Sequence, residues 1–404
     1  MNFLWNFLSR FMLTLSFIYV FVNCQNTPHS RYGQASVLVN NIFYFFGGTN
    51  TTKIFNEVWY LNLSSSFNAS APQWYRSIDM PVGYYWGSAC YSYSSKYIYL
   101  LGGRMYTPNT KNYNFPTVGY QFNPNTSQWL SLDSISSNKS FKTRNEIQAI
   151  IPNIYTNIYI LGGSNSSSPV TGYYNDMNIL DYNSMKWSTT LNQVNFPYLD
   201  YAAVFSPYYG IIIYVGGQEF NGTTLNRIDM NRIRIYDVTY SKWQDEVAGG
   251  EYIQPRVGHS AVLAPNGVVI VYGGSQDNMN PYGIVTPPIA TLNIKTWVWT
   301  SINLANTPSL TYHSAAVYGN FLIVAFGRNG KKYHNGIHIF DTINYKWITS
   351  LGQESYQDNS NQKYLDIGIG VGAGVLVLLV TSFIIYKIRT SVKPRNATGV
   401  TDGR

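Results

Sequence analysis

Few residues of this 404-residue chain could do chemistry, and they are Cys90, His259 and the adjacent pair Tyr312 and His313. Thiolate and imidazole side chains bind transition metals, but a metal site needs several of them in one place. The chain has only two Cys and five His, without a His-rich metal-binding spacing. It also lacks a Ser-His-Asp order, and "GRNGKK" (327–332) has neither the spacing nor the Ser or Thr of a Walker loop. These residues by themselves predict no enzyme, no metal and no cofactor.

A repeated element must position these residues. A short apolar run that ends in two glycines occurs five times, as "FYFFGG" (43–48), "YIYLLGG" (97–103), "IYILGG" (158–163), "IIYVGG" (212–217) and "VIVYGG" (269–274). A sixth copy, "LIVAFG" (322–327), has Arg328 in place of the second glycine. The copies lie roughly 55 residues apart, a period typical of repeats that are built from four strands.

Three further segments recur with each glycine pair. A small-residue run such as "GHSAVLA" (258–264) precedes it, and an alternating run such as "IRIYDV" (233–238) follows it. The last segment begins with Trp in every copy, at Trp74, Trp129, Trp187, Trp243, Trp299 and Trp347. Aromatic and β-branched residues favour strands, so each unit is predicted to be four short strands. The glycines would permit a sharp turn after the second strand, and the Trp would fill the gap between neighbouring units.

These units resemble kelch repeats. The closest matches are "RIYDVTYSKW" (234–243), "IFDTINYKW" (339–347) and "RVGHSAVL" (256–263). The resemblance covers residues 31–350, and it implies an all-β fold, a six-bladed kelch β-propeller over residues 25–350. The first and last units meet where the ring closes, at a seam. No strand of either unit is expected to join the sheet of the other.

The two ends of the chain predict a membrane location. Residues 11–22 are apolar and follow Arg10, which is typical of a signal peptide (1–24) cleaved after Cys24. An N-terminal anchor is the alternative, but the run is shorter than the ~20 residues that span a bilayer. Residues 367–386 form an uncharged apolar segment, predicted to be one transmembrane α-helix between a polar stalk (351–366) and a basic cytoplasmic tail (387–404).

The predicted topology is therefore a single-pass type I protein of the cell membrane or a secretory-pathway membrane, with the propeller on the extracellular or lumenal side. Within the span, "GIGVGA" (368–373) matches a dinucleotide fingerprint by chance, because it follows no strand. Gly368 and Gly372 instead give a small-residue helix face that would permit a homodimer. The net charge of +8 includes no basic run or stripe, so no nucleic-acid partner is expected.

Glycosylation is expected on the extracellular side. N-x-S/T sequons are surface acceptor sites in secreted domains, and not all of them are expected to be occupied. Those in the repeat region are Asn50, Asn62, Asn68, Asn125, Asn138, Asn165 and Asn221. If Cys24 leaves with the signal peptide, Cys90 remains as a lone thiol. It is expected to be buried in a small-residue strand, and a reactive thiol is the alternative.

The strongest enzyme hypothesis comes from the same resemblance. Some extracellular kelch propellers resemble galactose oxidase, a copper radical enzyme that uses two Tyr, two His and a Cys joined to one Tyr. Here "TYHSAAV" (311–317) is similar to its Tyr-His pair, and Cys90 lies in a comparable strand. Asn145 and Glu146 stand where the cross-linked Tyr is required, and no His follows His338. The ligand set is therefore incomplete, and an inactive oxidase is kept only as the alternative.

Binding is the function that remains. When the innermost strands of the six repeats are aligned, one position three residues before the aligned residues forms a set of equivalent residues, which we call a column. It consists of Arg31, Tyr84, Arg144, Tyr198, Arg256 and Leu310. Arg offers forked donors and Tyr a flat face, so this rim would suit an anionic or carbohydrate ligand. The alternative is that these Arg are part of the repeat and pair with backbone or carboxylate groups. We therefore expect a non-enzymatic glycoprotein whose ectodomain binds an extracellular protein or a glycan.

Overall fold

The structure is a computed structural model that describes residues 27–351, apart from 65–66, 109, 111, 113–116, 137, 139, 153–154, 166–171, 191–192 and 277–284. The predicted signal peptide, the stalk beyond its first residue, the membrane segment with Gly368 and Gly372, and the tail lie outside the described residues. Within the described part of the chain, no helix is long and apolar enough to cross a membrane.

The described chain is almost entirely antiparallel β-structure, which confirms the all-β prediction. Six sheets, numbered one to six along the chain, each contain four antiparallel strands. In the order in which they pair, the strands are β1 (Ala35–Val39), β2 (Ile42–Phe46), β3 (Val58–Asn62) and β4 (Trp74–Arg76) in sheet one; β5 (Gly83–Tyr91), β6 (Ile98–Tyr106), β7 (Gly119–Asn123) and β8 (Gln128–Ser131) in sheet two; β9 (Ala149–Ile150), β10 (Asn157–Leu161), β13 (Met177–Asp181) and β14 (Lys186–Thr189) in sheet three; β16 (Ala202–Ser206), β17 (Ile211–Val215), β20 (Arg232–Asp237) and β21 (Lys242–Val247) in sheet four; β23 (Ser260–Leu263), β24 (Val268–Tyr272), β25 (Ile289–Asn293) and β26 (Val298–Ile302) in sheet five; and β27 (Ser314–Tyr318), β28 (Phe321–Ala325), β31 (Ile337–Asp341) and β32 (Lys346–Ile348) in sheet six.

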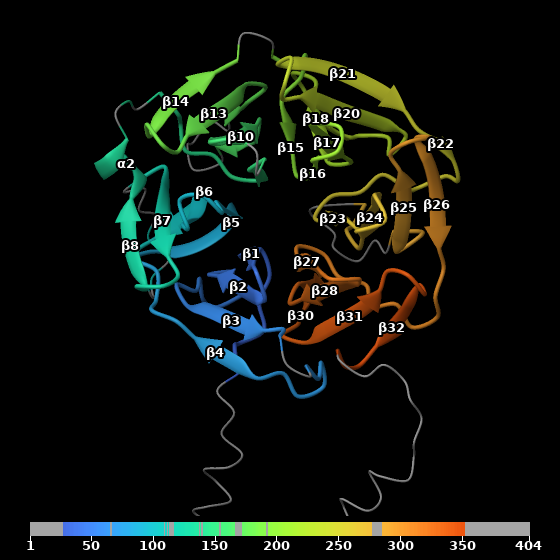
Figure 1. The fold of residues 1–404 in the computed structure, drawn as a ribbon, viewed down its shortest axis with the longest axis horizontal. Coiled ribbons are helices and arrows are strands. Elements are labelled where there is room, and N and C mark those ends of the chain that lie inside the picture. The colour runs from blue at the N-terminus through green and yellow to red at the C-terminus, as the bar shows by residue number, and fades with distance from the viewer. Residues whose placement is uncertain are drawn as a thin grey trace, which may run out of the picture. The chain divides into compact units, whose positions relative to one another are not determined.

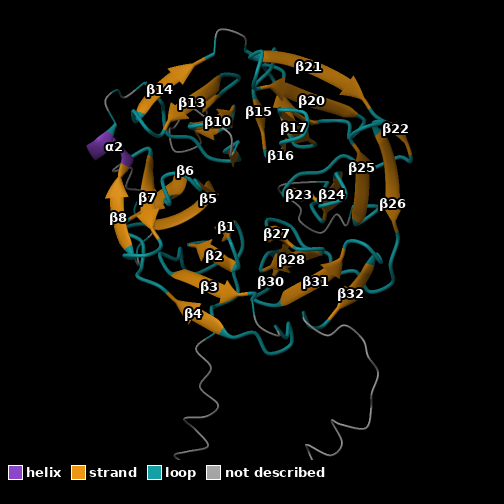
Figure 2. Ribbon diagram, viewed as in Figure 1, coloured by secondary structure: helices purple, strands orange, loops and turns teal. Residues whose placement is uncertain are grey.

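Smaller elements decorate these sheets. They are β11 (Ser164–Asn165) with β12 (Gly172–Tyr173), β15 (Tyr198–Leu199) with β18 (Gln218–Phe220) and β19 (Leu225–Arg227), β29 (Arg328–Asn329) with β30 (Lys332–Tyr333), β22 (Gly249–Gly250) parallel to β26, and the short helix α2 (Leu132–Ile135). Figure 2 shows that strands and loops make up nearly all of the described structure.

The sheets follow one another around a central axis, with their first strands innermost (Figure 1). Each first strand contacts the first strand of the next sheet, in the order β1, β5, β9, β16, β23, β27 and back to β1. Apolar core clusters fill the interfaces between neighbouring sheets, including the interface between sheets six and one. The described sheets therefore form a closed ring.

The recurrent Trp residues take part in these interfaces, as the sequence predicted. Trp299 is fully buried, and its Nε1 donates a hydrogen bond to the carbonyl of Met230 in sheet four, at 3.0 Å. Trp243 is only half-buried and packs on Tyr214 and Tyr236, with ring centroids 5.6 and 4.9 Å away. The recurrent Trp residues are therefore buried to different extents in different sheets.

The glycine pairs join each sheet to the next. The N–H of the second glycine donates to a backbone carbonyl of the following sheet, over 2.7–3.0 Å, from Gly48 to Tyr84, Gly103 to Arg144, Gly163 to Tyr198, Gly217 to Arg256, Gly274 to Leu310 and Gly327 to Arg31. In four of the five glycine pairs the first glycine lies close to the same carbonyl, and a Cβ on Gly47 would lie 2.1 Å from the Tyr84 oxygen, whereas a Cβ on Gly216 would meet the His259 ring. Both glycines also have positive φ, so they supply a close approach as well as the predicted turn.

The sixth copy of the pair differs from its sequence interpretation by one residue. Phe326, with φ 62°, takes the position of the first glycine, and Gly327, with φ 95°, takes that of the second. Arg328 follows the pair instead of replacing its second member. The misreading arose because sequence alone aligned Gly327 with the first glycine of the other copies.

The seam between sheets six and one has further connections. The N–H of Ala69 donates to Thr349, and the N–H of Leu351 donates to Phe67, at 2.8 and 2.7 Å. The side chain of Gln34 donates to Ser314 across the same seam, at 2.7 Å. Each main sheet is built from one continuous part of the chain, as expected, and only a short loop segment reaches across to the edge of sheet six.

Candidate functional site

The column that was predicted to form a binding rim is buried. The exposed fractions are 1% for Arg31, 0% for Tyr84, 2% for Arg144, 1% for Tyr198, 0% for Arg256 and 2% for Leu310. This corrects the expectation that these side chains are presented to a ligand. Their backbone carbonyls accept the glycine N–H groups described above, which draws the residues into the contact between sheets.

The polar side chains of this column bind their own sheet. Arg31, Arg144 and Arg256 donate from Nη1 to the carbonyls of Gly47, Gly162 and Gly273, at 2.9, 3.1 and 3.1 Å. The hydroxyl of Tyr198 donates to Gly216 at 2.8 Å, and that of Tyr84 donates to Leu101 at 3.3 Å. Arg and Tyr are thus interchangeable here because both can donate to the carbonyl at the turn. The alternative of a structural role accounts for the column.

The buried guanidinium groups differ in how their charge is compensated. Arg31 pairs with Glu57 at 2.6 Å, and Arg144 pairs with Asp176 at 2.5 Å. Burial would raise the pKa of Glu57, but Arg31 and the Trp59 N–H hold it below its usual value. Arg256 donates instead to the carbonyls of Gln254, Gly273 and Pro287, and burial lowers its pKa to about 10.

A different column, two residues further along the chain, lines the centre of the ring. It reads Gly33, Trp86, Glu146, Asp200, Gly258 and Tyr312, and φ is between 53° and 67° at every position. Non-glycine residues in this left-handed conformation cost roughly 1–3 kcal/mol each and cluster at functional sites. Four of the six residues are not glycine, so four side chains stand at positions where the backbone conformation favours glycine.

Backbone hydrogen bonds tie this central column together. Trp86 donates to Gly33, Glu146 to Trp86, Asp200 to Glu146, Tyr312 to Gly258 and Gly33 to Tyr312, over 2.7–3.0 Å. The last of these bonds crosses the seam. The column and the residues that follow it line a central cavity of about 130 Å³. We call this cavity and its rim the channel mouth.

One side of the channel mouth is acidic. Glu146 accepts a hydrogen bond from the Ser164 hydroxyl at 2.6 Å, and Asp200 accepts one from the Gln218 amide at 3.0 Å. Burial raises the pKa of Glu146, against the opposing effects of Ser164 and of the positive charge of Arg104. The two carboxyl groups come from adjacent sheets, three and four, and both line the cavity.

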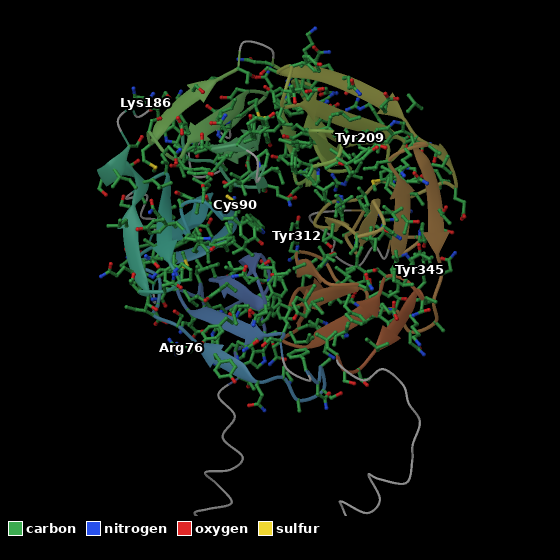
Figure 3. All side chains as sticks on the ribbon, in the orientation of Figure 1. Arg76, Cys90, Lys186, Tyr209, Tyr312 and Tyr345 are labelled. Atoms are coloured by element: carbon green, nitrogen blue, oxygen red, sulfur yellow. The ribbon has the colours of Figure 1, made fainter. Side chains whose placement is uncertain are left out.

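The other side combines cations with aromatic rings. The guanidinium of Arg104 lies 4.7 Å from the ring centroid of Trp86. That of Arg328 lies 4.6 Å from the ring of Tyr32 and 5.3 Å from the ring of Tyr312. Figure 3 shows Tyr312 beside the central axis, far inside Arg76 and Tyr345 at the periphery. The channel mouth is therefore asymmetric, with the carboxyl groups on sheets three and four and the guanidinium–aromatic contacts on residues of sheets one, two and six, among which Arg104 acts on the pKa of Glu146.

The residues of the oxidase hypothesis are separated by the fold. Tyr312 and His313 line the central cavity, where His313 Nε2 lies 2.8 Å from the Ser260 hydroxyl. Cys90 is free and buried in an apolar cluster with Tyr99 and Leu101, which confirms its expected burial, and burial raises the pKa of its thiol. Within the described ranges, no group of three or more His, Cys, Asp or Glu is arranged to hold a metal ion.

The predicted sequons lie on the surface of the described structure. Asn68, Asn125, Asn138 and Asn221 are exposed, whereas Asn50, Asn62 and Asn165 are partly buried. The Asn221 side chain accepts hydrogen bonds from the backbone of Thr223 and Thr224 within an exposed turn. All seven remain predicted sites.

Comparison with known proteins identifies the repeat. The family pattern described as the KLHDC2/KLHL20/DRC7 Kelch-repeats domain matches residues 33–245 and 210–360. A Kelch repeat-containing protein of Arthroderma benhamiae is 24% identical over 391 residues, covering 78% of this chain and 56% of its own length. The Acyl-CoA-binding domain-containing protein 4 of Arabidopsis thaliana is 20% identical over 336 residues, covering 77% and 45%.

A shorter match is the Kelch domain-containing protein 3 of Rattus norvegicus, 27% identical over 129 residues, which covers 29% of this chain and 33% of that protein. The chain thus spans about half the length, or less, of the curated relatives that it matches.

The ion pair in sheet one predicts that replacing Arg31 costs more stability than replacing Arg256. Arg31→Met should lower the free energy of unfolding by about 3 kcal/mol, because it leaves the buried Glu57 carboxylate with only the partly exposed Lys53, 3.9 Å away, as a cation. Arg256→Met leaves no partner carboxylate and should cost less. Urea denaturation of both variants measures the difference, and Arg31→Met/Glu57→Gln should recover part of the loss. Equal losses for the two single variants would contradict the assigned role of Glu57.

Two buried histidines predict acid sensitivity. Burial lowers the pKa of His259, with help from Arg256, and burial lowers the pKa of His313, to about 3 in each case. Both are neutral when folded, whereas unfolded His titrates near pH 6.5, so the unfolded state binds more protons below that pH. Stability should be constant above about pH 7 and fall by about 4 kcal/mol at pH 5.

The measurement is the free energy of unfolding at pH 7.5, 6 and 5, where Glu57 and Asp176 do not yet titrate. His259→Gln or His313→Gln should each remove about 2 kcal/mol of the loss at pH 5. The remaining pH dependence reports the other histidine together with further groups whose pKa values are also shifted by burial, namely His334, His338 and Glu146. A wild-type stability that stays constant down to pH 5 would show that these imidazoles are protonated without unfolding.

Proposed function

The chain belongs to the kelch-repeat family, and from this premise we propose that its six sheets are the blades of a propeller that binds a protein partner at the channel mouth. The observation that carries the proposal is the central column in left-handed conformation. Trp86, Glu146, Asp200 and Tyr312 occupy positions where the backbone favours glycine, and Gly33 and Gly258 show that glycine fits there. The repeat therefore does not require these four side chains.

The chemistry of the channel mouth suits a polar segment of a protein. Arg104 and Arg328 lie over aromatic rings, which favours contact with acceptors and flat groups. Glu146 and Asp200 offer acceptors for donors or a cation on the opposite side. A loop or chain end that carries both donors and acceptors would complement both sides, whereas a purely apolar segment would complement neither.

We further propose that this propeller is the ectodomain of a glycosylated single-pass type I membrane protein. The apolar runs at 11–22 and 367–386, the basic residues after the second run and the sequons support this topology. The partner would then be extracellular or lumenal. A homodimer through Gly368 and Gly372 is part of the same proposal.

We propose binding rather than catalysis. The oxidase alternative requires a second imidazole and a Tyr–Cys cross-link, and Cys90 lies in an apolar cluster between sheets two and three and is not among the residues that line the central cavity. A thioether between Cys90 and a Tyr, found by peptide mapping, would revive that alternative.

The binding proposal is tested by charge-neutralising variants. Partners cross-linked to the full-length chain on cells are identified by mass spectrometry, and their affinity is then measured with purified proteins. Arg104→Gln and Glu146→Gln should each weaken binding about tenfold or more, as expected for central contact residues. Lys186→Gln and Glu246→Gln, which neutralise charges on the outer strands β14 and β21, are the matched controls and should bind normally. Normal binding by both channel-mouth variants would place the partner elsewhere.

The topology is tested by glycopeptide mass spectrometry of the full-length chain from eukaryotic cells. Exposed sequons such as Asn125 and Asn221 should carry glycan, whereas Asn396, which heads a sequon beyond the apolar segment, should not. Glycan on Asn396 would reverse the proposed orientation. An entirely unmodified chain would overturn the secretory route without affecting the fold.

A further inference from the structure

A second polar pocket lies at the outer part of sheet four, away from the channel mouth. Its volume is about 180 Å³, room for roughly six water molecules. The polar and aromatic residues that line it are Gln193, Asn195, Arg234, Trp243, Gln244 and Asp245. The first two come from the connection that leads out of sheet three, and the others come from β20 and β21. The pocket therefore lies between two sheets, at a position where the chain offers several side-chain donors and acceptors.

Arg234 gives this pocket a buried donor. Only 8% of the residue is exposed. Its Nη2 lies 3.2 Å from Glu219 Oε1, and its Nε lies 3.4 Å from Asp245 Oδ1. Nη1 is buried and has no hydrogen-bond partner among the residues that the structure describes. An unsatisfied buried donor is costly, so this atom is suited to an acceptor on a bound molecule.

The repeat does not require an arginine at this position. The register of the second and third strands pairs Arg234 with Tyr214, just as it pairs the equivalent residues of the other sheets. Those equivalents are Trp59, Tyr120, Asn178, Ala290 and His338. Among these six positions, sheet four alone places a guanidinium there. The group is thus a particular feature of this sheet and not part of the structural pattern.

The charges around Arg234 favour a neutral ligand. Arg232 and Arg234 share Glu219, and Arg234 also contacts Asp245, so two cations face two carboxylates. An anion would have to compete with these carboxylates for the guanidinium. A hydroxyl group, by contrast, can accept from Nη1 and donate to the Asp245 carboxylate.

Trp243 adds a flat apolar face beside these polar groups. Its indole is held by Tyr236 and Tyr214, while the residue stays half-exposed at the pocket. A molecule with an apolar face and a rim of hydroxyls satisfies the indole, the amides of Gln193, Asn195 and Gln244, and the Arg234–Asp245 pair together. We propose that this pocket binds one neutral pyranose unit of a glycan. The proposal goes beyond the channel-mouth function and is independent of it.

The experiment uses the purified full-length chain in a detergent without a sugar headgroup. Methyl glycosides of glucose, galactose, mannose and N-acetylglucosamine are titrated up to 10 mM, a range chosen for the roughly millimolar affinity of a single small ligand. Binding is followed by saturation-transfer NMR and by Trp fluorescence. We expect at least one glycoside to bind and to perturb Trp243, so that Trp243→Phe removes the fluorescence change.

Variants separate this pocket from the rest of the protein. Gln193→Ala/Gln244→Ala/Asp245→Ala changes only exposed residues and leaves Arg234 paired with Glu219, so it should fold and melt at most slightly below wild type while affinity falls at least tenfold. Asn303→Ala, on the outer part of sheet five, and Arg104→Gln, at the channel mouth, should leave sugar binding unchanged. The proposal is overturned if no glycoside binds, if the triple variant binds normally, or if Arg104→Gln abolishes binding.

Discussion

The hydrogen bond from the second glycine of each pair to the next sheet is the interaction on which the ring depends. It recurs at all six interfaces, at 2.7–3.0 Å, and its acceptor always belongs to the column that starts with Arg31. The acceptor carbonyl lies so close that a Cβ on Gly47 or Gly162 would come within 2.1 Å of it. In four of the six sheets the side chain of the acceptor residue then donates to the carbonyl of the first glycine of its own sheet, as Arg144 does to Gly162. One contact thus explains both glycines and the buried Arg or Tyr opposite them.

The same contact explains how the ring closes without exchanging a main strand. Gly327 donates to Arg31 across the seam, so sheets six and one are joined as any other pair is. Closing a ring removes the outer faces that six separate sheets would expose. What is special at the seam is Phe326, which takes the place of the first glycine and packs on Phe45 and Trp74. At the interface between sheets six and one, an aromatic contact therefore takes the place of the close contact that a first glycine makes with the backbone.

The sequence predicted most of the fold but not the burial of the proposed rim residues. Strand positions, the glycine turns, the outer Trp and the burial of Cys90 followed from residue type and a period near 55 residues. The burial of the column that starts with Arg31 was not predicted, because an Arg in a polar turn resembles an exposed Arg until its partners are known. The left-handed conformation of Trp86, Glu146, Asp200 and Tyr312 could not be inferred from these residue types. A clue was available, since glycine occupies the same column at Gly33 and Gly258.

The two columns differ in the interactions that hold them. Residues such as Arg256 are fixed by buried donors and acceptors, so few side chains can replace them. The central column is held by backbone bonds, including those from Trp86 to Gly33 and from Gly33 to Tyr312, and these bonds make no demand on the side chain. Any residue that tolerates positive φ can therefore stand there, at a cost of roughly 1–3 kcal/mol. Because backbone bonds link five of the six neighbouring pairs in this column, the channel mouth can carry different side chains in each sheet without losing these bonds.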